Sequence, residues 1–132
     1  MKRFDRLKAV VSLDAIAHNF AEMKKNIAEG TKMIAVIKAD GYGHGAEAIA
    51  RLTDNYSYIW GYAVATAEEA LQLRNAGVEK PILILGLVFE EYFREMVADD
   101  IRLTVCEYET AKKLSREAVR QDKTVHIHIG LD

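Results

Sequence analysis

Short apolar runs rich in β-formers alternate along this chain with stretches of helical periodicity, and this alternation restricts the fold more than any other feature. Successive apolar runs start roughly 20 to 26 residues apart, and the repeating units show no similarity in sequence. A strand–helix–strand alternation with short turns predicts a parallel sheet of the α/β class. The predicted strands are residues 9–13, 33–37, 59–64, 82–85, 103–105 and 125–129.

The segments between the predicted strands carry helix start and stop signals. Asp14 is placed to cap a helix over residues 14–28, and a shorter helix is expected over 46–52. Thr66 and Glu69 have the spacing of a capping box for a helix over 67–75, which Gly77 is placed to end. Two further helices are expected over residues 90–98 and 107–120.

Length and composition limit the architecture and the class of function. Local periodicity does not separate a barrel from an open doubly wound sheet, and 132 residues are too few for a complete (β/α)8 barrel of about 250. The formal net charge of −2 shows no basic excess, so no nucleic-acid partner is expected. One cysteine excludes an internal disulfide, and no apolar run is long enough to span a membrane, so we expect a soluble cytoplasmic protein.

Lys38 ends the second apolar run and is followed by a glycine-spaced loop, within the string VIKADGYGHG. A lysine at the end of a strand can pack its stem against apolar walls while its amine reaches a cavity. Desolvation there lowers an amine pKa, and a neutral amine can attack a carbonyl carbon. Glycines at 41, 43 and 45 allow close approach of the backbone to a ligand, and Tyr42 offers a hydroxyl to an anionic oxygen.

The string VIKADGYGHG resembles the cofactor attachment segment of alanine racemases. The resemblance extends to AVVSLDAIAHNF near the start, GYAVATAEEALQLRNAGVEKPILILG in the middle and VHIHIGLD at the end. It implies an N-terminal (β/α)8, TIM-type barrel, of which this chain would hold about five of the eight strands. Residues 1–14 would be a strand segment that joins the C-terminal domain, and residues 15–132 the first part of the barrel.

The same resemblance implies a pyridoxal 5'-phosphate enzyme that interconverts L-alanine and D-alanine for peptidoglycan synthesis, as a homodimer in the full-length protein. Lys38 would hold the cofactor and move the α-proton on one face. Tyr42 would bind the cofactor phosphate, and Leu85 would line the cofactor ring. A tyrosine of the partner subunit's C-terminal domain would serve the other face, so these 132 residues alone are expected to be inactive.

One position departs from the pattern of the resembled family. Gly130 stands where many alanine racemases carry a lysine that can be carbamylated to orient an arginine, and glycine cannot do this. His126 and His128 share one strand face, but without further ligands we interpret them as structural, with no metal site. Cys106 precedes an acidic residue and is interpreted as an inert thiol, and His44 is expected to bond backbone or to pack.

Other interpretations remain open at this point. A related barrel could carry pyridoxal phosphate without catalysis, a relative could racemise serine or another amino acid, or the glycine loop could bind a phosphate in a scaffold module. A partial barrel would also leave two open sheet edges and an uncovered apolar face. We therefore expect the isolated chain to be marginally stable and to self-associate.

Overall fold

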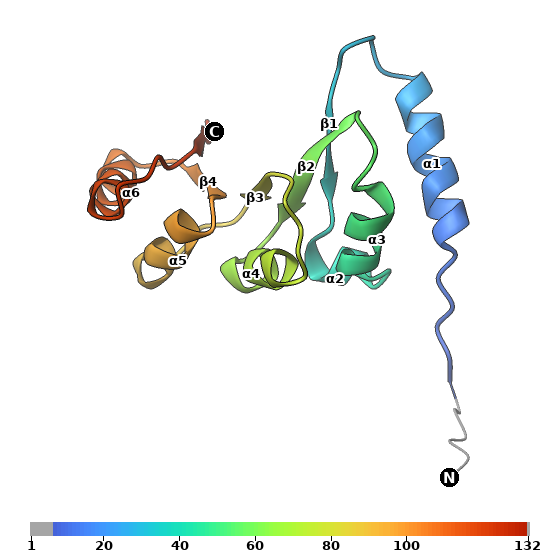
Figure 1. Ribbon diagram of the computed structural model, residues 1–132, viewed down its shortest axis with the longest axis horizontal. Helices are drawn as coiled ribbons and strands as arrows, with labels where there is room; N and C mark the ends of the chain where they lie inside the picture. Colours follow the sequence, from blue (N-terminus) through green and yellow to red (C-terminus); the bar gives the residue numbers. More distant parts are fainter. Residues whose placement is uncertain (1–6, 132) are drawn as a thin grey trace.

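A computed structural model describes residues 7–131 and shows one sheet of five parallel strands (Figure 1). The strands are hydrogen-bonded in chain order, and each pairs in parallel with the next. Five of the six predicted strands are therefore confirmed, with bounds that differ by at most two residues. They are β1 (Met33–Val36), β2 (Ile59–Val64), β3 (Ile82–Ile84), β4 (Ile101–Val105) and β5 (Ile127–Ile129).

Helices connect the strands, and the predicted helices all form. None of the helices within residues 7–131 has the length and apolarity that crossing a membrane requires. The first third of the helix expected over 90–98 is a tight 3₁₀ turn, η1 (Glu90–Tyr92). The α-helices are α1 (Leu13–Lys25), α3 (Ala46–Thr53), α4 (Ala67–Asn75), α5 (Phe93–Ala98) and α6 (Tyr108–Arg120). The short segment labelled α2 (Lys38–Tyr42) is a helical turn with left-handed backbone angles.

The strand order separates the two architectures that periodicity left open. Each crossover between neighbouring parallel strands is expected to be right-handed, and here the order β1-β2-β3-β4-β5 never reverses. Uniform winding places every connecting helix on the same face of the sheet, as in a barrel, whereas a doubly wound sheet reverses its order. Figure 1 shows β1 and β5 at opposite ends of the array, so the barrel is partial and open.

The two faces of the sheet differ in burial. On the helix side Tyr62, Ile84 and Leu103 are almost fully buried. On the other face of β1, Ile34 and Val36 are 39% and 42% exposed. The uncovered apolar face expected of a partial barrel is therefore present at β1, because an open five-stranded sheet does not close over its own inner surface.

Two predictions at the start of the chain are wrong. Residues 9–12 form no strand, and Leu13 already belongs to α1. A strand needs a hydrogen-bonding neighbour, and within residues 7–131 this segment has none. The cap of α1 is Ser12, whose hydroxyl accepts from the N–H of Ala15 at 3.2 Å, while Asp14 lies in the first turn. The expected role of residues 1–14 as part of another domain stays a prediction, and residues 1–6 lie outside the described residues.

The signals around α4 are confirmed. The Thr66 hydroxyl accepts from the N–H of Glu69 at 3.3 Å, and the Glu69 carboxylate accepts from the N–H of Thr66 at 3.3 Å. Gly77 follows the helix with φ +88°, a backbone conformation that a glycine adopts without steric cost. These local contacts fix where α4 begins and ends.

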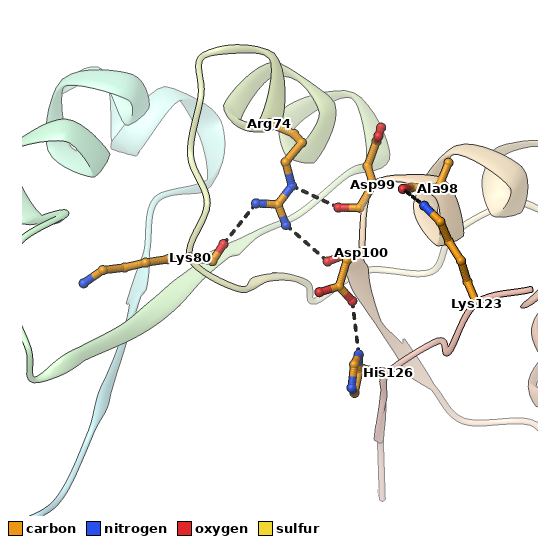
Figure 2. Close-up of polar contacts among 7 residues, drawn as sticks. All are labelled: Arg74, Lys80, Ala98, Asp99, Asp100, Lys123 and His126. Carbon is orange, nitrogen blue, oxygen red and sulfur yellow. Dashed lines mark hydrogen bonds and ion pairs between the residues drawn. The ribbon is translucent and has the colours of Figure 1, made fainter.

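Arg74 of α4 joins the loops that lead into β3 and β4 (Figure 2). Its guanidinium donates to the backbone carbonyls of Lys80 at 3.2 Å, Asp99 at 3.0 Å and Asp100 at 3.2 Å. Burial lowers the pKa of Arg74, while the charges of Asp100 and Asp99 act in the opposite direction. These contacts hold two βα units together at the N-terminal ends of their strands.

Further polar contacts at this end of the sheet involve the segment that leads into β5 (Figure 2). Nδ1 of His126 lies 3.1 Å from a carboxylate oxygen of Asp100, and the Lys123 ammonium donates to the carbonyl of Ala98. This end of the sheet is thus occupied by structural contacts. The carboxyl ends of the strands, where ligands bind in barrels, lie at the opposite edge.

Candidate active site

Lys38 lies just beyond the carboxyl end of β1. Regular strand pairing ends at Val36, although the N–H of Ile37 still donates to the carbonyl of Ala63 at 2.8 Å. The Lys38 side chain is half-buried, and no hydrogen bond or ion pair joins its amine to another residue in the part of the chain that the structure describes. The amine is therefore available to an external group.

The four residues after Lys38 form a turn of left-handed helix. Ala39, Asp40, Gly41 and Tyr42 have φ between +50° and +62°. Left-handed geometry costs a residue other than glycine roughly 1–2 kcal/mol, so the turn persists only because surrounding contacts hold it. Gly41 is needed for a second reason, since a Cβ there would lie 2.8 Å from Cδ1 of Ile49.

Two carboxylates tie this turn to the neighbouring helices, one from within the turn and one from α4. An oxygen of Asp40 accepts from the N–H of Ala46 at 2.9 Å, which ties the turn to the start of α3. An oxygen of Glu69, on α4, accepts from the N–H of Ala39 at 2.6 Å. Sequence analysis assigned Glu69 only to the capping box. A contact across thirty residues leaves no local signal, so this second role could be found only from the structure.

Tyr42 presents its ring at the surface and is 59% exposed. It lines an apolar groove of about 500 Å³ between α1 and β1, together with Phe20, Ile34 and Val36. Nδ1 of His44 lies 3.0 Å from a backbone carbonyl, which confirms the expectation that this histidine bonds backbone. The sequence-predicted residues Lys38 and Tyr42 are joined by the left-handed turn.

Leu85 follows β3 at the same edge of the sheet. Its N–H donates to the carbonyl of Val64 at 2.8 Å, which continues the strand pairing, and its side chain is 44% exposed. The structure thus places Leu85 at the carboxyl end of the third strand and Lys38 at that of the first. Its predicted contact with a cofactor ring stays a prediction.

Gly130 lies at the carboxyl end of β5, beside Cys106 at the end of β4. A Cβ built at position 130 would lie 2.8 Å from Sγ of Cys106 and 3.2 Å from Cγ2 of Thr104. The cysteine sulfur therefore occupies the space into which a side chain at 130 would extend. A residue with a side chain at position 130 would therefore require the Cys106 side chain to move.

The two histidines near β5 serve separate contacts. His126 pairs with Asp100, and the ring of His128 lies 6.2 Å from that of Trp60. Over residues 7–131, no group of three or more histidine, cysteine or acidic side chains is arranged to hold a metal ion.

The fold and the site define an α/β barrel domain with an available lysine at the carboxyl end of its first strand. Residues 11–132 match the model of the family described as "Alanine racemase, N-terminal domain". The chain belongs to the alanine racemase family.

Individual relatives agree with this assignment. The chain is 43% identical over 122 residues to alanine racemase 1 of Caldanaerobacter subterraneus subsp. tengcongensis, and 44% identical over 124 residues to alanine racemase 1 of Oceanobacillus iheyensis. Each match covers 92% of this chain but only 31% and 32% of the relative. The chain thus spans about a third of the length of the curated relatives it matches.

Solved structures show the same fold. An alanine racemase of Clostridium difficile 630 in complex with cycloserine matches with a TM-score of 0.89 and 34% identity, over 92% of this chain and 32% of that one. A histidine racemase of Leuconostoc mesenteroides subsp. sake matches with a TM-score of 0.78 and 28% identity, over 89% of this chain and 31% of that one.

The residues at this edge fit pyridoxal phosphate by their chemistry. Lys38 supplies a primary amine with no partner among the described residues, Tyr42 an accessible phenol, and Leu85 an exposed apolar surface. An aldehyde, a phosphate and an aromatic ring are the groups that these three side chains would bind.

Proposed function

We propose that the complete gene product containing these 132 residues is a pyridoxal 5'-phosphate-dependent alanine racemase. The observation that carries the proposal is the position of Lys38, an amine without a partner within residues 7–131, placed directly before a constrained turn at the carboxyl end of β1. Membership in the alanine racemase family supports the same reaction.

In this proposal, Lys38 would hold the cofactor through its aldehyde, with loss of water, until the substrate amine displaces the lysine. The freed Lys38 amine would then remove or return the proton at the substrate Cα on one face. The Tyr42 hydroxyl donates to a phosphate oxygen, and Leu85 lies against the cofactor ring. When bound, pyridoxal phosphate withdraws the electrons that remain on Cα after the proton leaves. The protein residues supply position and the base.

A single lysine serves one face of Cα, so inversion needs a second base on the opposite face. We propose that it comes from a partner subunit in a homodimer, from sequence beyond these residues, and that the 132 residues alone do not racemise alanine. We further propose a cytoplasmic enzyme that supplies D-alanine for peptidoglycan, with no nucleic-acid or membrane partner.

The competing functions are a non-catalytic pyridoxal-phosphate carrier and a racemase for another amino acid. The likeness to a histidine racemase, at 28% identity, makes the second alternative specific enough to test. Among the solved structures, the alanine racemase of Clostridium difficile 630 matches at 34% identity, above the 28% of the histidine racemase, which favours alanine as substrate.

The test measures D-amino acid formation by the purified complete gene product with L-alanine, L-serine and L-histidine in parallel. We expect alanine to react fastest, Lys38→Ala to abolish turnover and the surface variant Lys112→Ala to retain it. Tyr42→Phe should weaken cofactor affinity about tenfold, because one hydrogen bond to a charged oxygen is lost. Cofactor binding without turnover of any substrate would favour the carrier, and preferred turnover of serine or histidine would replace alanine as substrate.

A further inference from the structure

Glu69 connects the backbone beside Lys38 to the loop after the next strand. One carboxylate oxygen accepts from the N–H of Ala39 at 2.6 Å. The other accepts from the N–H of Ala65 at 2.7 Å and from that of Thr66 at 3.3 Å. A single acceptor-only side chain therefore satisfies three backbone donors in two loops.

The capping box explains only part of this arrangement. Capping α4 requires the bond between Glu69 and Thr66, but it gives no reason for a bond to Ala39, which lies in the loop after β1. That bond is short, as expected when the acceptor is ionised. The contact with Ala39 is thus a separate role of the same carboxylate.

Holding the Ala39 N–H constrains Lys38 directly. The peptide unit that joins the two residues is planar, so fixing its N–H also fixes the carbonyl of Lys38 and the start of the turn. Ala39 has φ +50° and ψ +50°, which an alanine rarely adopts unless other contacts enforce it. Two described hydrogen bonds act on Ala39: its carbonyl accepts from the N–H of Gly43 at 3.1 Å within the turn, and its N–H donates to Glu69. Glu69 therefore supplies the contact from outside the turn.

We propose that Glu69 is a positioning residue for Lys38, which anchors the Ala39 peptide so that the lysine amine is held ready for the cofactor aldehyde. This inference rests on the proposed function, because it concerns the reactivity of the same lysine. Glu69 acts through the backbone and touches neither substrate nor cofactor in this account.

The test compares Glu69→Gln with Thr66→Ala in the complete gene product. Glutamine has one acceptor oxygen in place of two, so it cannot serve both Ala39 and the Ala65–Thr66 pair. Thr66→Ala removes the other half of the capping box and leaves the bond to Ala39 intact. The threonine variant therefore controls for any effect that passes through the stability of α4.

The first measurement is amide hydrogen exchange at Ala39 in protein freed of cofactor. We expect Glu69→Gln to raise the exchange rate about tenfold, from the loss of one charge-assisted hydrogen bond, and Thr66→Ala to leave it within about twofold. Equal changes in the two variants, or no change in Glu69→Gln, would overturn the proposal.

The second measurement is the rate at which added pyridoxal phosphate becomes attached to Lys38, located by peptide mapping after borohydride reduction. We expect a rate about tenfold lower in Glu69→Gln than in Thr66→Ala or wild type. Equal attachment rates would refute the positioning role and leave the proposed function intact. Failure of the wild-type protein to react at Lys38 would refute the proposed function, and the positioning role with it.

Discussion

The contacts of Arg74 lead to a quantitative prediction about how the βα units are held together. We consider replacement of Arg74 by methionine, which keeps much of the apolar stem and removes every donor. The variant loses the bonds to the carbonyls of Lys80, Asp99 and Asp100 that Figure 2 draws. It also loses a further bond to the carbonyl of Val78.

The burial of these bonds sets the expected magnitude. The bonds to Val78 and Lys80 are partly buried, and each is assigned about 1 kcal/mol, because their carbonyls lose a charged donor with limited access to water. Those to Asp99 and Asp100 are exposed, so solvent replaces them and together they contribute at most about 1 kcal/mol. The total is about 2–3 kcal/mol.

The assay is hydrogen exchange of the β3 and β4 amides in the complete gene product. A loss of about 2–3 kcal/mol raises the exchange rate through sub-global opening about 30- to 140-fold. Arg116→Met serves as the control, because Arg116 is exposed and makes no hydrogen bond or ion pair among the described residues, and we expect it to change the opening free energy by less than about 0.5 kcal/mol. Equal exchange in the two variants would refute the reasoning.

Three further predictions concern the core, pH and association. Tyr62→Phe should cost about 1–2 kcal/mol in the same assay, because the buried hydroxyl bonds to the Ala50 carbonyl at 2.8 Å and to Thr53 at 2.9 Å; an unchanged opening free energy would contradict this. Hydrogen bonding from Arg120 lowers the pKa of Glu117 to about 2. The stabilising effect of the Glu117 carboxylate should therefore be complete above pH 4.5 and lost as the pH falls toward 2. An NMR titration midpoint of Glu117 near pH 4.5 would refute this. The 132-residue chain alone should self-associate in light scattering at rising concentration, and a sharp monomeric unfolding transition independent of concentration would show otherwise.

Much of the fold could be predicted because the responsible forces are local. The alternation of apolar runs and helical periodicity located all five strands, and the spacing of Thr66 and Glu69 fixed the start of α4. Sequence spacing predicted Asp14 as the cap of α1, but the cap is Ser12, two residues earlier, because the extended backbone that a cap needs lies at Ser12. Likewise, β-propensity at residues 9–13 could not form a strand without a neighbouring chain segment.

The motif allowed candidate site residues to be proposed, but the backbone conformation that holds them could not be predicted. Lys38 and Tyr42 could be selected from the motif, whereas a left-handed turn through Ala39 and Asp40 opposes the intrinsic preference of those residues. Contacts with other elements hold it, and the bond that the Ala39 N–H donates to Glu69 crosses thirty positions of sequence. Such contacts follow from the assembled sheet and have no local signature.

The proposed function requires that the Lys38 amine, and no other amine of the protein, binds the cofactor aldehyde. The decisive measurement is peptide mapping by mass spectrometry of the complete gene product after saturation with pyridoxal phosphate and borohydride reduction. We expect a single pyridoxyl label, on Lys38, that disappears in Lys38→Ala. A label on another lysine such as Lys80, or no label at all, would contradict the account.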